Sequence, residues 1–184
     1  MTNITQSASH CYAFEQDFIG NWRCIPLCVR RKLDLSGVKL KLNHWLALTQ
    51  DQRQQLVDWP DTPDALHDLR GHLRQCTAAM PDGRVKDLDP VTAAPWQQVD
   101  DLPLDVADAA AARGVELTAV HWRAIRELDR FALSLGMLLG MSHGWVTADA
   151  LQQQPMQGFD PIETVNSATQ FNPFSSRSHQ FFPY

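Results

Sequence analysis

The sequence predicts an all-α protein, in which a compact helical domain is built from two tandem helical repeats. Three observations favour this fold. Residues 25–56 and 102–133 align without gaps at a constant offset of 77 positions and share eleven identical residues. Both copies carry helix start and stop signals. No stretch alternates convincingly between apolar and polar residues with the period of two that is typical of a half-buried strand.

Each repeat is expected to contain an opening helix, a glycine turn, a short helix with a His-Trp pair, and a closing helix. Pro26 and Pro103 suit the first turn of the opening helix, because that turn leaves N–H groups unpaired and proline has none. Gly37 and Gly114 suit its end, because glycine adopts the left-handed conformation without a Cβ clash. The duplication also predicts a pseudo-twofold relation between units spanning about 25–57 and 102–134.

Capping residues locate the remaining helix starts. Thr118 is the expected N-cap of the short helix in the second copy. Thr49, with Gln52 three residues later, predicts a capping box at the closing helix of the first copy. Between the copies, Thr62 and Pro63 start a further helix that ends near a turn at residues 80–83.

The chain length of 184 residues favours one domain. We assign it to residues 13–152, preceded by a flexible N-terminus at 1–12. Residues 81–101 are expected to form an ordered connector on the surface. Residues 153–184 are polar with scattered aromatic side chains, so they are expected to be a disordered or loosely docked tail.

Composition excludes several classes of protein. A net charge of −5 argues against general nucleic-acid binding. No apolar run approaches the ~18 residues that span a bilayer, and residues 1–10 do not resemble a secretory signal. We therefore expect a cytoplasmic protein that does not bind membranes. Its four cysteines are expected to be free thiols.

The two copies differ most in charge. Residues 25–57 carry six positive and two negative side chains, whereas residues 102–134 carry four positive and five negative ones. A local positive field in an acidic chain can steer an acidic protein surface or an anionic cofactor. The alternative is a solvated basic face without a partner. The candidate partner- or anion-binding residues are Arg30, Arg31, Lys32, Lys39 and Lys41.

Lys32 differs from the other cations, because helical rotation places it among the apolar Ile25, Val29 and Leu33. Its counterpart in the second copy is Ala109. Two interpretations are open: the side chain snorkels past the helix end, or it reaches a ligand.

Metal-ligating residues are sparse. Cys24 and Cys28 are four residues apart and share a helix face, at a spacing that suits a soft metal. That face is also apolar, so packing as buried thiols is favoured. His44 and His121 each precede a tryptophan, and a hydrogen-bonding role at the repeat interface or surface is favoured over ligation. A zinc site would need a second pair of ligands at suitable spacing, so we expect no metal and no cofactor.

No carboxylate pair, nucleophile elbow, phosphate loop or Ser-His-Asp order is present in the sequence. This agrees with a protein that is not an enzyme.

The first copy also carries a distinctive motif. It runs Phe14-Glu15-x-Asp17-Phe18, then Arg23-Cys24-Ile25-Pro26-Leu27-x-Val29-Arg30-x-Lys32-Leu33-Asp34-x-x-Gly37-Val38-Lys39-Leu40. Further residues extend this motif: Trp45, Arg53-Gln54-Gln55-Leu56-Val57, Pro60 and Pro63, and later Gly114-Val115, Trp122 and Arg130-Phe131-Ala132-Leu133. Together they resemble the nitrate-reductase-associated protein family over residues 13–150. The resemblance implies a non-catalytic accessory protein that binds assimilatory nitrate reductase and supports its activity, with molybdenum-cofactor insertion as a candidate step.

A second hypothesis comes from the residues alone. The protein would bind a metal or a small anionic ligand through Cys24, Cys28, Lys32 and the paired histidines, His44 and His121. The charge difference between the copies directs both hypotheses to the first copy, with the second copy as a scaffold that completes its core.

Overall fold

The structure, a computed structural model, describes residues 8–12, 15, 20–112 and 114–138. This part of the chain is mostly helical, which confirms the helical class that the sequence predicts. The elements in chain order are α3 (Leu27–Ser36), β1 (Val38–Lys39), α4 (Leu42–Ala47), α5 (Gln50–Asp58), α6 (Pro63–Thr77), β2 (Lys86–Asp87), the 3-10 turn η2 (Pro95–Gln97), α7 (Leu104–Ala111), α8 (Ala119–Ala124) and α9 (Glu127–Leu138).

The expectation of a purely helical protein needs one correction. β1 and β2 pair antiparallel, with Val38 opposite Asp87 and Lys39 opposite Lys86. Each strand has only two residues, too few to leave a period-two pattern in the sequence.

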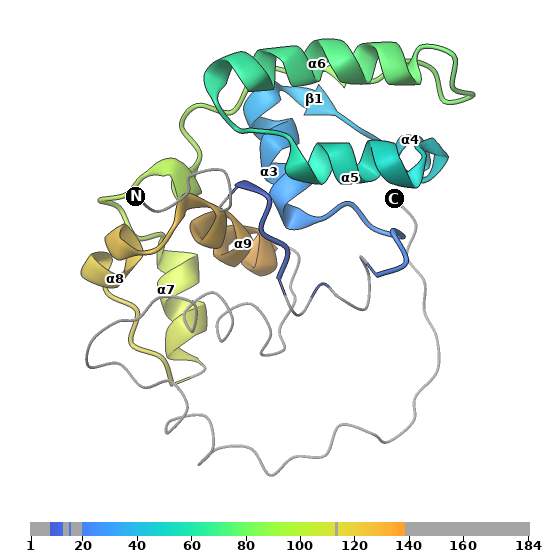
Figure 1. Cartoon of the computed structure of the whole chain (residues 1–184). Helices are drawn as coiled ribbons and strands as arrows, with labels where there is room; N and C mark the ends of the chain where they lie inside the picture. Colours follow the sequence, from blue (N-terminus) through green and yellow to red (C-terminus); the bar gives the residue numbers. More distant parts are fainter. Residues whose placement is uncertain (1–7, 13–14, 16–19, 113, 139–184) are drawn as a thin grey trace, which may run out of the picture.

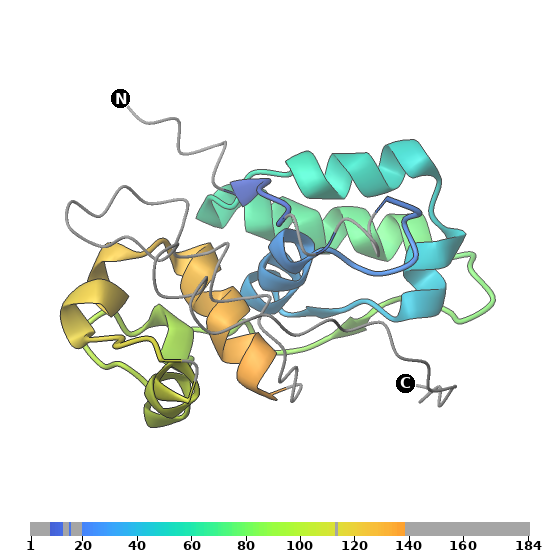
Figure 2. The same cartoon turned by 90° about the horizontal axis from the view of Figure 1, so that it is seen from below.

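Helix α3 lies at the centre of the described fold. It packs against α5 and α6 on one side and against α9 on the other. Figure 1 shows α6 above this helix, α4 and α5 to its right, and α7, α8 and α9 to its lower left. Seen from below in Figure 2, α9 lies beside α3, and α7 and α8 lie beyond α9. The interface between α3 and α9 therefore joins the first repeat to the second.

The helices of the two repeats begin at equivalent positions. Helices α3 and α7, α4 and α8, and α5 and α9 each start 77 residues apart. Gly37 and Gly114 both adopt positive φ, at 64° and 74°. The expected pseudo-twofold relation between the units stays a prediction.

Several shared residues have packing roles. Trp45 and Trp122 are fully buried, and each indole N–H donates to a backbone carbonyl, at 2.9 and 2.8 Å. Arg53 lies over the Trp45 ring at 5.8 Å, and Arg130 lies over the Trp122 ring at 5.9 Å. Both guanidinium groups also donate to backbone carbonyls. These four residues therefore stabilise the interior of their repeats.

The predicted caps are confirmed. Thr49 and Gln52 exchange the two hydrogen bonds of a capping box at the start of α5. Thr62 accepts the N–H of Ala65 at 3.4 Å at the start of α6. Thr118 caps α8.

The N-terminal residues 8–12, which the sequence assigns to a flexible segment, contain two buried side chains, Ala8 and Tyr12. The Tyr12 hydroxyl donates to Asp129 Oδ1 of α9 at 2.7 Å. Glu15 accepts the N–H groups of Tyr12 and Leu27, at 3.0 and 2.8 Å, and so satisfies an unpaired N–H group at the start of α3.

The predicted tail at 153–184 lies outside the described residues. No helix in the described ranges is long and apolar enough to span a membrane.

Candidate functional site

Three consecutive cations of α3 point to three different places. Successive residues of an α-helix are rotated by about 100°, so neighbours in sequence do not share a face. Arg30 lines a groove, Arg31 is 7% exposed, and Lys32 is fully buried. The five predicted binding residues therefore do not form one continuous surface.

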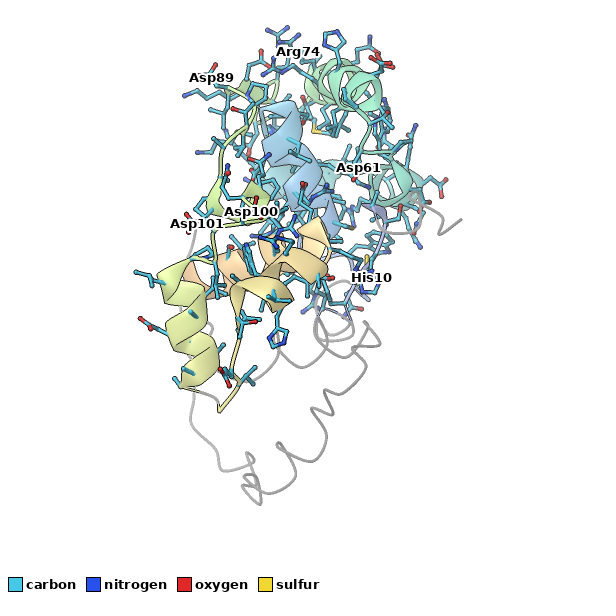
Figure 3. All side chains as sticks on the ribbon, turned by 90° about the vertical axis from the view of Figure 1, so that its left-hand side faces the viewer. His10, Asp61, Arg74, Asp89, Asp100 and Asp101 are labelled. Atoms are coloured by element: carbon cyan, nitrogen blue, oxygen red, sulfur yellow. The ribbon has the colours of Figure 1, made fainter. Side chains whose placement is uncertain are left out.

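Arg31 links α3 to α9 and to the α5–α6 loop. Its Nε and one terminal nitrogen donate to Glu127 Oε1 at the start of α9, at 3.0 and 2.7 Å. Its other terminal nitrogen donates to Asp61 in the α5–α6 loop at 2.9 Å. Figure 3 shows Asp61 beside α3. Each of the three guanidinium nitrogens donates to an internal carboxylate, which leaves little of the group for a partner.

Lys32 does not snorkel to the surface, because its side chain is fully buried. Its Nζ donates to the carbonyls of Leu56 and Val57 at 3.2 and 2.6 Å, in the last turn of α5. A cation at this position satisfies orphan carbonyls and is favoured by the helix dipole. Burial lowers the pKa of the Lys32 ammonium. The structure overturns the interpretation in which Lys32 snorkels, and the role in ligand binding stays a prediction.

The other three predicted cations lie around one groove of about 770 Å³ between α3, β1, α4 and α9. They are Arg30, Lys39 and Lys41. The apolar side chains that line the groove are Ile25, Leu33, Val38, Leu40, Leu42, Leu88, Phe131 and Leu135. We call this feature the α3–α9 groove: an apolar floor with three positive side chains.

The charged groups at the groove are weakly engaged by the protein itself. Lys39 and Lys41 are exposed, and Lys41 Nζ lies 4.0 Å from Asp82. Arg30 Nε donates to Ile25 O at 3.0 Å, which fixes the base of its guanidinium. Among the described residues that line the groove, Asp34 is the one carboxylate, and burial raises its pKa although Arg30 opposes this effect. The field at the groove is therefore positive.

Two large apolar side chains of the groove are open to solvent. Leu42 is 40% exposed and Leu88 is 45% exposed. Apolar side chains clustered beside charged ones are typical of protein interaction sites, since the apolar area favours association and the charges select the partner. The groove can thus accommodate an acidic segment with apolar side chains.

The cysteines of the alternative hypothesis lie in different environments. Cys24 lines the α3–α9 groove, whereas Cys28 is fully buried and its sulfur lies 3.8 Å from that of Cys11. Within residues 8–12, 15, 20–112 and 114–138, no group of three or more His, Cys, Asp or Glu side chains is placed to hold a metal.

The paired histidines cap their own helices. Nδ1 of His44 accepts the N–H of Lys41, and Nδ1 of His121 accepts the N–H of Thr118, each at 3.3 Å. His44 is 1% exposed. The repeated histidine thus forms hydrogen bonds at the start of α4 and α8, in agreement with the expected hydrogen-bonding role; His44 is buried, whereas His121 is partly exposed.

Comparison with known proteins identifies the family of this chain. Residues 11–137 match the family described as conserved nitrate reductase-associated protein, a match that includes the groove. The chain belongs to this family. No curated protein and no solved structure gives a significant match. The family resemblance seen in the sequence is therefore confirmed.

Sequence reasoning missed the contribution of the second repeat to the groove. Phe131 and Leu135 of α9 form part of its wall, so this repeat does more than complete a core. Their apolar spacing along α9 was visible, but only the packing of α9 against α3 shows which element they face. The sulfur contact between Cys11 and Cys28 had no signal in the sequence, because seventeen positions separate the two residues.

Proposed function

We propose that this protein is a non-catalytic accessory protein that binds assimilatory nitrate reductase and supports its assembly, with insertion of the molybdenum cofactor as the step served. Membership of the family supports the association with nitrate reductase. The feature that supports a binding role is the α3–α9 groove, which combines exposed apolar side chains with a basic rim.

The groove favours an acidic, partly apolar segment of the reductase as its occupant. Apolar side chains of such a segment would cover Leu42 and Leu88, and its carboxylates would pair with Lys39 and Lys41. Rim charges mainly raise the association rate and select the partner, whereas the buried apolar contacts supply most of the affinity. Binding should therefore weaken as salt is added, without being abolished.

The direct test is co-purification of the full chain with nitrate reductase, followed by a titration of the two purified proteins. In the variant Lys39→Glu/Lys41→Glu, each reversed charge should cost about 1 kcal/mol, so binding should weaken by about 30-fold. Both side chains are exposed, so the fold should be kept.

A matched control is available on other surfaces of the chain. Arg84→Glu/Arg123→Glu changes the net charge by the same amount, and both residues are exposed and outside the groove. This control should bind like the parent protein. If both variants weaken binding equally, the effect comes from net charge and not from the groove. If the parent protein does not associate with nitrate reductase, the proposed partner is refuted.

The assembly step requires a separate experiment. Deleting the gene in its host should leave nitrate reductase protein present with low activity and a reduced molybdenum content. Restoring the parent gene should recover both, and the groove variant should recover less than the control variant. A reductase with full molybdenum content in the deletion strain would exclude cofactor insertion as the step.

We further propose that the protein works in the cytoplasm. The four cysteines are free in the structure, which is usual for proteins kept in a reducing compartment. Fractionation of host cells, with the reductase as the reference, tests this placement.

A further inference from the structure

Two thiols from distant parts of the chain meet beside the start of α3. Cys11 belongs to the N-terminal segment and Cys28 to the first turn of α3, and their sulfur atoms are 3.8 Å apart. A disulfide bond is about 2.05 Å long, so the sulfurs need to approach by less than about 2 Å. The other two cysteines, Cys24 and Cys76, lie elsewhere, in the α3–α9 groove and beside His72 of α6.

The two thiols differ in access to solvent. Cys28 is fully buried. Cys11 is partly buried and lines a second cavity of about 370 Å³, together with Trp22, Pro26 and Gln54. A small molecule that enters this cavity therefore meets Cys11 first, with Cys28 directly behind it.

Their electrostatic surroundings differ as well. The hydrogen bond with Cys28 lowers the pKa of the Cys11 thiol, and the Lys32 ammonium lowers it further, against the opposing effects of burial, Glu15 and Asp58. The same hydrogen bond and burial raise the pKa of Cys28. Access from the cavity and the direction of these shifts both favour Cys11 as the attacking thiol, with Cys28 reacting second.

We propose that Cys11 and Cys28 form an oxidisable thiol pair that reacts with hydrogen peroxide to give an intramolecular disulfide. This inference does not depend on the proposed partner. A small oxidant suits the cavity, and Cys11 presents its sulfur there.

The reaction has two steps. The Cys11 thiolate attacks one oxygen of the peroxide, the O–O bond breaks, and the departing hydroxide takes up a proton to leave as water. Cys11 is then a sulfenic acid. The Cys28 sulfur attacks Cys11 Sγ, the S–O bond breaks, and the released hydroxide leaves as water with the proton of the Cys28 thiol. In total, two thiols and one peroxide give one disulfide and two waters, and a dithiol reductant reverses the change.

The disulfide would fasten the N-terminal segment to α3. In the reduced protein, this segment is held by the contact of Tyr12 with Asp129 and by the two N–H groups that Glu15 accepts. Oxidation would add a covalent link to these contacts, next to the interface between α3 and α9.

The test is a thiol count on the full chain. The protein is reduced, freed of reductant, treated with one equivalent of hydrogen peroxide, and blocked with N-ethylmaleimide. We expect free thiols to fall from four to two, and peptide mapping to find Cys11 linked to Cys28. Loss of all four thiols at equal rates, or a disulfide that includes Cys24 or Cys76, would overturn the proposal.

Variants assign the roles, with circular dichroism to confirm that each is folded. Cys24→Ser, the matched control four residues before Cys28 and outside α3, should still lose two thiols. Cys28→Ala should stop at a sulfenic acid on Cys11 that dimedone labels, and Cys11→Ser should lose no thiol under the same treatment. A disulfide that forms in the parent but disappears in Cys24→Ser would contradict the assignment, and the count on the parent protein stands even if Cys28→Ala does not fold.

Discussion

Replacing Arg31 by methionine tests whether this residue holds the fold together or serves a partner. Methionine keeps the unbranched apolar stem of the side chain and removes the guanidinium. Three charge-assisted hydrogen bonds, two to Glu127 and one to Asp61, are then lost. The Arg31 side chain is 9% exposed, whereas those of Asp61 and Glu127 are 20% and 36% exposed.

These exposures set the magnitude of the loss. A hydrogen bond to a charged group contributes about 1.5–3 kcal/mol when it is buried, and an exposed ion pair contributes about 0–1 kcal/mol. With the carboxylates partly in water, we assign roughly 1 kcal/mol to each bond, so Arg31→Met should lower the free energy of unfolding by about 3 kcal/mol. At a urea m-value of about 2 kcal/mol/M, the midpoint should fall by about 1.5 M.

The assay is urea unfolding followed by circular dichroism, with Lys39→Met as the exposed control that should change stability by less than about 0.5 kcal/mol. A double-mutant cycle of Arg31→Met with Glu127→Gln should give a coupling energy of about 1–2 kcal/mol. A loss below about 1 kcal/mol with no coupling would refute the bridge, and Arg31 would again be a candidate for partner binding.

Three further predictions follow from the described contacts. Gly37→Ala should destabilise the fold by at least about 3 kcal/mol in thermal unfolding, because an added Cβ would clash with Leu88 O and Arg70. Gly114 has a similar φ but open space around it, so Gly114→Ala should cost about 1 kcal/mol. The pKa of Lys32 lies below its ordinary value of 10.5, so at a pH between these two values the unfolded chain binds more protons than the folded protein. The free energy of unfolding of the parent protein should therefore rise relative to that of Lys32→Met as the pH increases through this window. Tyr12→Phe should cost about 1–2 kcal/mol in urea unfolding, because it removes a donor from a buried carboxylate; an unchanged midpoint would contradict that contact.

The placement of the charges explains why a charge count could not locate the site. The sequence counts Arg30, Arg31 and Lys32 as one basic cluster, and their adjacency makes the cluster look dense. Helical rotation sends Arg30 to the groove, Arg31 to the carboxylates near α9, and Lys32 to the carbonyls of α5. Two of these three charges are therefore neutralised or satisfied inside the protein.

The sequence by itself determined the local structure of this protein. The helix starts at the threonine caps and the end of α3 at Gly37 follow from signals within a few residues of each position, whereas α7 ends at Ala111, before the predicted Gly114. Capping, left-handed glycine and helical periodicity are local effects, so a single chain is enough to identify them. The family motif is likewise a property of the sequence.

The tertiary structure decided what those elements face. The groove between α3 and α9, the bridge from Arg31 to Glu127 and the contact of Cys11 with Cys28 each join residues that are far apart in the chain. Such pairings depend on how whole helices pack, because burial and electrostatic partners are set by the surfaces that meet and not by the neighbours in sequence. The repeat therefore predicted the units, and only their packing showed that both contribute to the candidate site.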